Sequence, residues 1–310
     1  MTTLLVSQPT THEHITPPGH AERQERLEAI AQALSASRFS GLRREVAQSA
    51  DLALAELVHD PSVLKTLQKH RPAEGISAID GDTFLSPQSL DVAALALGAG
   101  MRALEAVAMG EVDNAFCAIR PPGHHAEKKR SMGFCLLNTI AILARLAQQM
   151  YGAERIAIID FDVHHGNGTQ NIFESDPSVF YGSSHQMPLF PGTGASTETG
   201  VGNICNAPLL AQSDGEQMRD AYLNRIIPAL SDFSPDFLLI SAGFDAHFRD
   251  PLANLNWNEN DFAWLTGKLM DFADQKCGNR IVSLLEGGYD LNGLAGGVTN
   301  HVAMLEKGTL

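Results

Sequence analysis

Short runs of apolar and β-branched residues alternate along this chain with longer stretches of helical periodicity, and this alternation restricts the possible folds most. The predicted buried strands cover residues 115–119, 156–161, 179–182, 237–241 and 281–285, with residues 4–6 as a possible edge strand. Helix-like stretches lie near residues 22–36, 88–109, 138–150, 215–231, 259–275 and 293–306. Strands that alternate with helices predict an α/β fold, whose central and mostly parallel sheet is flanked by helices on both faces.

The chain shows no internal repeat, no low-complexity tract and no linker of the kind that separates domains. A stretch rich in proline and glycine, residues 187–202, lies between a predicted strand and a later helix, and it predicts a long surface loop. A length of 310 residues suits one large α/β domain or two small ones. We expect one domain over residues 1–310.

Charge and composition exclude several classes of function. The net charge of −14 argues against binding to nucleic acid or to an anionic membrane, and it favours cationic substrates. The four cysteines form no C-x-x-C pair, so neither a disulfide framework nor a cysteine zinc site is expected. The first residues lack the pattern of a signal peptide and no apolar run reaches 18 residues, so the cytoplasm is the expected location.

The carboxyl ends of the predicted strands run into polar or glycine-rich segments. These segments are residues 120–125, 160–168, 183–185, 243–247 and 286–289. In open α/β sheets, ligands bind in the crevice beyond the carboxyl ends of the strands. We therefore expect the five segments to converge on one rim that carries the chemistry.

The densest group of ionisable residues is the segment DFDVHHGNG, residues 160–168. On an extended chain, side chains two residues apart share a face, so Asp160, Asp162 and His164 point the same way. Carboxylate and imidazole are zinc ligands, and a catalytic zinc needs three protein ligands and one open position. Any converging carboxylate or histidine can be the third ligand, and Asp245 is the best placed. The alternative, in which these acids cap the next helix or pair with arginines, leaves many close charges without compensation.

Two further segments supply candidate catalytic groups. The motif RPPGHHA carries His124 and His125, which can act as metal ligands or as general acid and base. Adjacent residues point in different directions, so the two rings need different partners. Residues 287–289 place Tyr289 after two glycines, where its hydroxyl can donate to a developing oxyanion. Each segment alone also fits a surface or turn motif, and their position at one rim favours catalysis.

Taken together, these motifs resemble those of the histone deacetylase family, whose members have the arginase/deacetylase fold. The matching segments, in the family's order, are RPPGHHA (120–126), GFCLLN (133–138), DFDVHHGNGTQ (160–170), FPGTG (190–194), SAGFDAH (241–247) and LEGGYD (285–290). The segments HAERQERLEAI (20–30) and GDTFLSP (81–87) resemble the family's entrance segments. The resemblance implies a three-layer fold and zinc-dependent hydrolysis of an N-acetyl or short acyl amide on a lysine-like amine.

The resemblance also implies a role for each matching residue. One catalytic zinc ion would be held by Asp162, His164 and Asp245. The catalytic residues would be His124, His125, Tyr289, Asp160 and Asn167. In this assignment the two histidines are the acid–base pair and the tyrosine is the oxyanion donor, while Asp160 accepts from His124 and Asn167 from His125.

A potassium ion and a substrate channel complete what the resemblance implies. The potassium site would use Asp160, Asp162, His164, Ser183 and Ser184, partly through backbone carbonyls. The substrate-binding residues would be Gly133, Phe134, Phe190, Asp82 and Leu252. Phe134 and Phe190 would line a narrow channel that Gly133 helps to shape, with Asp82 at its rim. Polyamine-specific relatives can place a glutamate at the position of Leu252 to meet a distal ammonium. A leucine at this position disfavours that kind of recognition.

Asn167 carries information about the class of relatives. Relatives of the first class have aspartate at this position, whereas asparagine resembles the second class and its bacterial homologues. A neutral amide orients His125 without a charge that would raise the pKa of the imidazole. We therefore expect neutral His125 at pH 7, ready to act as a base.

Three alternatives stay open at this point. The first is an amidohydrolase acting on acetylpolyamines or small amides through the same site. The second is a binuclear manganese ureohydrolase of the arginase kind, which needs further carboxylates where this chain has Gly166 and His247. The third is an inactive module that binds acyl-lysine, which loss of His125 or Tyr289 would have indicated. We expect His247 beside the site rather than as a ligand, and the sequence leaves the oligomeric state open.

Overall fold

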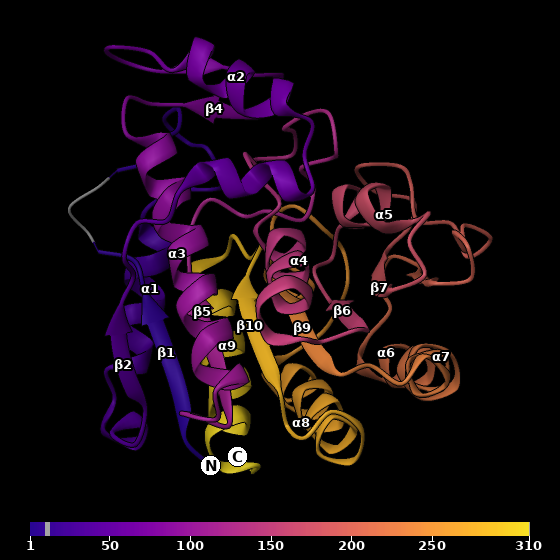
Figure 1. The fold of residues 1–310 in the computed structure, drawn as a ribbon. Helices are drawn as coiled ribbons and strands as arrows, with labels where there is room; N and C mark the ends of the chain where they lie inside the picture. The colour runs from indigo at the N-terminus through magenta and orange to yellow at the C-terminus, as the bar shows by residue number, and fades with distance from the viewer. Residues whose placement is uncertain (10–12, 310) are drawn as a thin grey trace.

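A computed structural model of the chain describes residues 1–9 and 13–309 and contains an eight-stranded sheet (Figure 1). Its order is β2-β1-β5-β10-β9-β6-β7-β8, and every pairing is parallel. The strands are β1 (Thr3–Ser7), β2 (Arg43–Val46), β5 (Asn114–Ala118), β6 (Ile156–Asp160), β7 (Val179–Gln186), β8 (Ile204–Leu209), β9 (Phe237–Ala242) and β10 (Ile281–Leu285). A small antiparallel pair, β3 (Ser77–Ala78) and β4 (Phe84–Leu85), lies apart from this sheet.

Helices cover both faces of the sheet. They are α1 (Glu25–Leu34), α2 (Pro61–His70), α3 (Ser89–Ala108), α4 (Thr139–Tyr151), α5 (Asn167–Phe173), α6 (Gly215–Ala221), α7 (Ile227–Phe233), α8 (Glu259–Lys276) and α9 (Leu291–Lys307). Helices α3 and α4 pack together on one face, while α9 packs between α1 and α8 on the other (Figure 1). A π-helical segment, Tyr222–Ile226, joins α6 to α7. These three layers confirm the predicted α/β fold.

Two details of the predicted topology are wrong. Residues 4–6 do not form an edge strand, because the polar strand β2 pairs outside β1 and takes the edge. The segment 187–202 is a loop as predicted, but it leads to β8, a strand that was not predicted. Asn206 and Pro208 interrupt the apolar pattern of β8, and proline is tolerated there because β8 lies at the other edge of the sheet.

The central strands bring their carboxyl ends to one edge of the sheet, which positions the site. Strands β5, β6, β9 and β10 are buried along their whole length and β7 likewise, as expected for strands covered on both faces. Asp160 at the end of β6 lies in register with Ser241 on β9 and Ser183 on β7. The segments that follow these strands therefore start from the same level.

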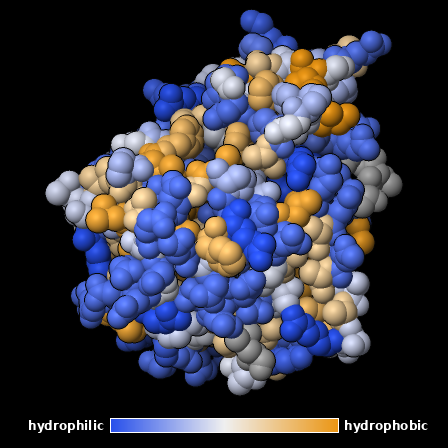
Figure 2. All heavy atoms as spheres, turned by 180° about the vertical axis from the view of Figure 1, so that it is seen from behind, coloured by the Kyte–Doolittle hydropathy of each residue, from blue (hydrophilic) through white to orange (hydrophobic). Residues whose placement is uncertain are grey.

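One face of the molecule, seen from behind, is largely hydrophilic (Figure 2). Hydrophilic residues cover most of this face and hydrophobic residues form small groups among them (Figure 2). Within residues 1–9 and 13–309, no helix combines the length and the apolar character needed to cross a bilayer.

Candidate active site

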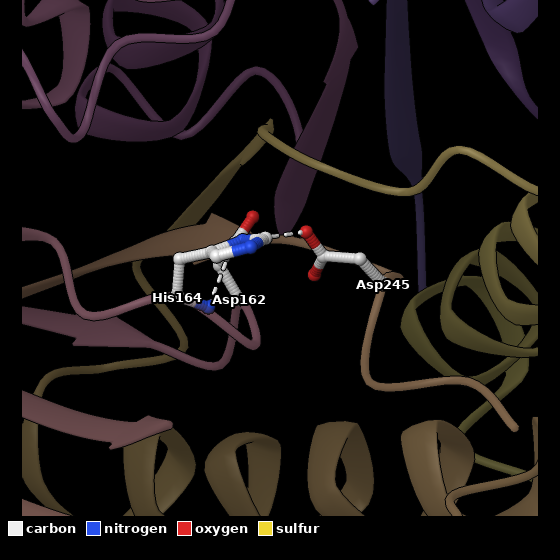
Figure 3. A group of neighbouring side chains, drawn as sticks. All are labelled: Asp162, His164 and Asp245. Carbon is white, nitrogen blue, oxygen red and sulfur yellow. Dashed lines mark hydrogen bonds and ion pairs between the residues drawn. The ribbon is translucent and has the colours of Figure 1, made fainter. Parts of the chain in front are cut away.

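Three buried side chains from the segments after two neighbouring strands form a cluster of metal-ligand type. Asp162 and His164 follow β6, and Asp245 follows β9 (Figure 3). Their ligand atoms all lie within 4.8 Å of one another. The Nδ1 atom of His164 is 3.2 Å from Oδ1 of Asp162 and 3.2 Å from Oδ2 of Asp245. Over the described part of the chain, this is the one group of three such residues close enough to hold an ion.

The charges in this cluster fit a cation. Both carboxylates are buried, and backbone amides hold them: Val163 N–H donates to Asp245 (2.9 Å) and Gly287 N–H donates to Asp162 (2.8 Å). Burial opposes a charged imidazole, yet the two carboxylates raise the pKa of His164 to about 10. Two carboxylate oxygens and one imidazole nitrogen are a donor set that zinc accepts, so the residues fit this ion.

Gly287 allows the last strand to approach this cluster. A Cβ atom at this position would overlap the carboxylates of Asp245 and Asp162. A residue with a side chain would therefore displace both acids, so the glycine after β10 is required by the geometry of the site.

The two histidines after β5 lie beside the cluster, with their rings 4.0 Å apart between centroids. Nδ1 of His124 is 3.0 Å from Oδ2 of Asp160, and Nδ1 of His125 is 2.8 Å from Oδ1 of Asn167. Burial opposes the charged form of His124, but Asp162 and Asp160 raise its pKa to about 10. Burial, together with the charges of His124 and His164, lowers the pKa of His125 well below its ordinary value. The surroundings therefore favour the charged form of His124 and the neutral form of His125.

A cavity of about 240 Å³ opens above the cluster. It is lined by Asp82, His125, Gly133, Phe134, His164, Leu189, Phe190, Leu252 and Tyr289. The lining thus contains all five residues that the sequence assigns to the substrate, together with Leu189, which the sequence reasoning missed.

The wall of the cavity beside His125 contains a strained segment. Gly133 and Phe134 both have positive φ values, +59° and +68°, and Phe134 is held there by a hydrogen bond from its N–H to Oγ1 of Thr83 (3.1 Å). Positive φ is uncommon for a bulky residue. The Phe134 ring contacts the Tyr289 ring edge to face at 5.8 Å, so this conformation brings the two aromatic rings together.

The mouth of the cavity combines apolar and acidic side chains. The Phe190 ring is 41% exposed and meets the His125 ring edge to face at 5.1 Å. Leu252 is 37% exposed on the loop after β9. Burial raises the pKa of the Asp82 carboxyl, which also accepts a hydrogen bond from Thr83 Oγ1 (3.0 Å).

The residues assigned to potassium lie on β6 and β7 and in the segment after β6. Asp160 accepts from the Tyr181 hydroxyl at 2.9 Å as well as from His124. The Ser183 and Ser184 hydroxyls bond to His185 (2.9 Å) and Tyr222 (3.1 Å), so these two oxygens already have partners. Potassium at this site stays a prediction.

His247 is buried and does not line the cavity. Its Nδ1 accepts from the Arg249 N–H at 3.2 Å, and its Nε2 lies 3.4 Å from Oε1 of Glu259. The ring stacks on Phe248 at 4.6 Å. These contacts give His247 a role in packing the loop after β9.

Two buried acids that hold the site were missed by the sequence reasoning. The Glu286 carboxylate accepts from the N–H groups of Gly123 (2.7 Å) and His124 (3.2 Å), which fixes the loop after β5. The Asp250 carboxylate accepts from the Tyr289 N–H at 2.7 Å. An acid at a strand end followed by two glycines was the available signal for Glu286.

Comparison with known proteins places this geometry in a family. Residues 20–305 match the histone deacetylase domain. The chain belongs to the histone deacetylase family. It is 37% identical to histone deacetylase 10, chloroplastic, of Oryza sativa over 91% of this chain and 68% of the rice protein. It is 38% identical to a probable deacetylase of Archaeoglobus fulgidus over 94% of this chain and 83% of that one.

A solved structure of the family agrees with the fold. The crystal structure of the HD domain of HDA15 is similar with a TM-score of 0.92 and 32% identity, over 99% of this chain and 90% of that one. The resemblance inferred from the motifs is thereby confirmed, and with it the deacetylase fold. Like its relatives, this histone deacetylase family member is a hydrolase that acts on amide bonds.

Proposed function

We propose that this enzyme removes an acetyl or short acyl group from a lysine-like amine, using one zinc ion. The observation that carries the proposal is the cavity that ends on the Asp162, His164 and Asp245 cluster, with His125 on one wall and Tyr289 on another. The acyl-amine chain would enter between Phe134 and Phe190. Zinc dependence is typical of the family, and the donor set fits the ion.

The chain's own residues would divide the chemistry as follows. When bound, zinc supplies Lewis-acid chemistry, polarising the amide carbonyl and making water easier to deprotonate. His125, neutral and held through Nδ1, would take the proton of the attacking water at Nε2. Tyr289 would donate its hydroxyl to the oxygen that becomes negative. The protonated His125, assisted by the positive charge of His124, would then return a proton to the leaving amine.

Two polar side chains beside the cluster would hold the histidines in this arrangement. Asp160 would hold His124 through its 3.0 Å contact, and Asn167 would orient His125. We also propose that a potassium ion binds near Asp160 through backbone carbonyls of the two strand-end segments.

An acyl-lysine side chain is the substrate class that fits best. The net charge of −14 and Asp82 at the mouth favour a substrate with positive or polar groups beside the acyl chain. An acetylpolyamine is the second candidate, and it carries a distal ammonium. Polyamine-specific relatives can place a glutamate at the mouth to bind this ammonium, whereas this chain has the apolar Leu252 there. The mouth thus favours an acetyl-lysine peptide over an acetylpolyamine.

Turnover of three substrates by zinc-loaded protein tests the proposal. An acetyl-lysine peptide, acetylputrescine and acetylspermidine are compared by kcat/KM, with zinc-free protein and an Asp245→Ala variant as controls. We expect the peptide to be preferred and both controls to be inactive. Preference for the acetylpolyamines would favour the second candidate, and no hydrolysis of any of the three would contradict the proposal.

A further inference from the structure

Asn167, the partner of His125, is itself held by a charged group at the surface of the loop after β5. Its Nδ2 donates to Oε1 of Glu127 at 2.7 Å. The Glu127 carboxylate also accepts from Arg130, through Nε at 2.8 Å and a terminal nitrogen at 3.1 Å. Asn167 is buried, whereas the Glu127 side chain is 21% exposed and that of Arg130 is 62% exposed. A chain of contacts therefore runs from the surface to the imidazole.

The chemistry of these groups fixes the direction of each hydrogen bond between Arg130, Glu127, Asn167 and His125. An ionised carboxylate can only accept, so the Asn167 atom that faces Glu127 must be the NH₂ group. The Asn167 carbonyl oxygen then faces His125, and it too can only accept. Nδ1 of His125 must therefore carry the proton, because it lies 2.8 Å from that oxygen. Nε2 is left with its lone pair free, which is the state a general base requires.

Asn167 alone does not determine which nitrogen of His125 carries the proton. The amide of an asparagine is nearly symmetric in shape, and rotation by half a turn exchanges its oxygen and nitrogen. In the rotated state the NH₂ group would face His125, and the imidazole proton would move from Nδ1 to Nε2. His125 could then not accept a proton from water at Nε2. The remaining contact of the NH₂ group is a weak one to the sulfur of Met132 at 3.4 Å. The charged acceptor that selects one orientation is Glu127.

We propose that Glu127 is a positioning residue that sets the tautomer of His125 by fixing the orientation of the Asn167 amide. The proposal rests on the proposed function, in which His125 is the base. Arg130 supports it by donating to both oxygens of the Glu127 carboxylate, including the oxygen that accepts from Asn167. Gly168 allows α5 to lie close to the loop after β5, because a Cβ atom there would overlap the backbone of Ala126.

Four variants separate this role from a merely structural one. Glu127→Ala removes the acceptor, and Glu127→Lys replaces it with a donor that attracts the amide oxygen and turns NH₂ toward His125. Asn167→Asp in each of these backgrounds restores an oxygen at His125 whichever way the side chain turns. Lys129→Ala is the matched control, since it changes an exposed residue of the same loop. Thermal unfolding and zinc content check that each variant is folded and loaded.

The first readout is the ¹⁵N spectrum of the histidines in labelled protein, with and without zinc. We expect Nδ1–H at His125 in the wild-type protein, loss of this form in Glu127→Ala, Nε2–H in Glu127→Lys, and recovery of Nδ1–H in both double variants. The second readout is turnover of the acetyl-lysine peptide. We expect kcat to fall about 10- to 100-fold in the single variants, with KM little changed, and to rise again in the double variants.

The possible results are distinguishable. If His125 keeps Nδ1–H in both Glu127→Ala and Glu127→Lys, the positioning role is overturned, whatever the rates. If the tautomer changes as expected but kcat does not, the positioning role stands and the assignment of His125 as base in the proposed function fails. A third result is a loss of kcat without a change of tautomer, which Asn167→Asp does not recover. This result indicates a structural role for Glu127 and also overturns the proposal.

Discussion

Tyr289 shows how strongly a single side chain in this site is constrained. Phe134 contacts its ring from one side, and the Arg26 guanidinium lies 5.0 Å from the ring centroid. Arg26 also donates to the carbonyl oxygen of Gly288 at 2.7 Å, so it holds both the ring and the backbone before it. Burial raises the pKa of the Tyr289 phenol well above its ordinary value. The hydroxyl therefore keeps its proton at neutral pH and is available as a donor.

Replacement of Tyr289 by phenylalanine removes this donor and little else. Loss of one oxyanion donor typically costs about 10² to 10³ in kcat. We expect Tyr289→Phe to lose turnover by this factor while zinc content and thermal stability stay close to wild type. Steady-state kinetics and elemental analysis on the same preparation check this. A wild-type rate in the variant would contradict the role of Tyr289.

The number of metal ions per chain follows from the three clustered ligands. With one group of three ligand residues over residues 1–9 and 13–309, we expect one tightly bound zinc ion per chain. Asp245→Ala should reduce this to well below one, because a site with two ligands binds zinc weakly. Elemental analysis after dialysis measures both. Two ions per wild-type chain would favour the binuclear alternative.

At the scale of the elements, Asp250 joins the loop after β9 to the loop after β10. One of its carboxylate oxygens accepts from the Leu252 N–H at 3.0 Å, and the other accepts from the N–H groups of Tyr289 (2.7 Å) and Asp290 (3.3 Å). Burial, with the nearby charge of Asp245, raises the pKa of Asp250 to about 7. One buried acid therefore sets the distance between two walls of the cavity.

Asp250→Asn tests this link. The amide NH₂ of asparagine would meet N–H donors on one side, so at least one loop loses its acceptor, at a cost of about 1 to 3 kcal/mol in stability. We expect kcat to fall in the wild-type background but to change little further in a Tyr289→Phe background. The double-mutant cycle measures this coupling. If the effects of the two substitutions on kcat multiply in the double variant, Asp250 does not act through Tyr289.

The same elements show what the sequence can predict. Asp162, His164 and Asp245 were expected to converge because parallel strands end at one edge, and this rule needs no knowledge of strand order. Glu286, Asp250 and Glu127 were not expected, because each accepts from backbone or amide groups whose positions depend on strand register and loop conformation. The edge strand β2 escaped notice for a related reason, since its exposed polar pattern resembles that of a loop.

At the scale of the whole molecule, a buried ion network connects the N-terminal segment to the sheet and to the loop after β10. Glu22 accepts from Arg120 through Nε (2.5 Å) and a terminal nitrogen (2.8 Å), and it lies 3.4 Å from Arg26 and 3.6 Å from His14. Arg120 follows β5, and Arg26 reaches the carbonyls before Tyr289. One carboxylate thus compensates two buried arginines from distant parts of the chain.

This network makes stability depend on pH in a defined window. Burial opposes the charge of Glu22, but the arginines and His14 lower its pKa from 4.5 to about 2. Because the folded pKa is the lower one, the stabilisation is fully present above about pH 4.5 and is lost as the pH falls toward 2. Each tenfold change in the acid dissociation constant corresponds to about 1.4 kcal/mol, so this stabilisation is on the order of 3 kcal/mol.

Glu22→Gln isolates this contribution, because all other titrating groups are shared with the wild-type protein. We expect the variant to be less stable by several kcal/mol at pH 7, since two buried arginines lose their counter-charge. The difference in free energy of unfolding should stay constant down to about pH 5 and then shrink as the pH approaches 2. Urea unfolding of both zinc-free proteins at a series of pH values measures it. A difference that does not change between pH 5 and 2 would mean that Glu22 titrates normally in the folded state, and that the network stabilises the fold through packing rather than through charge.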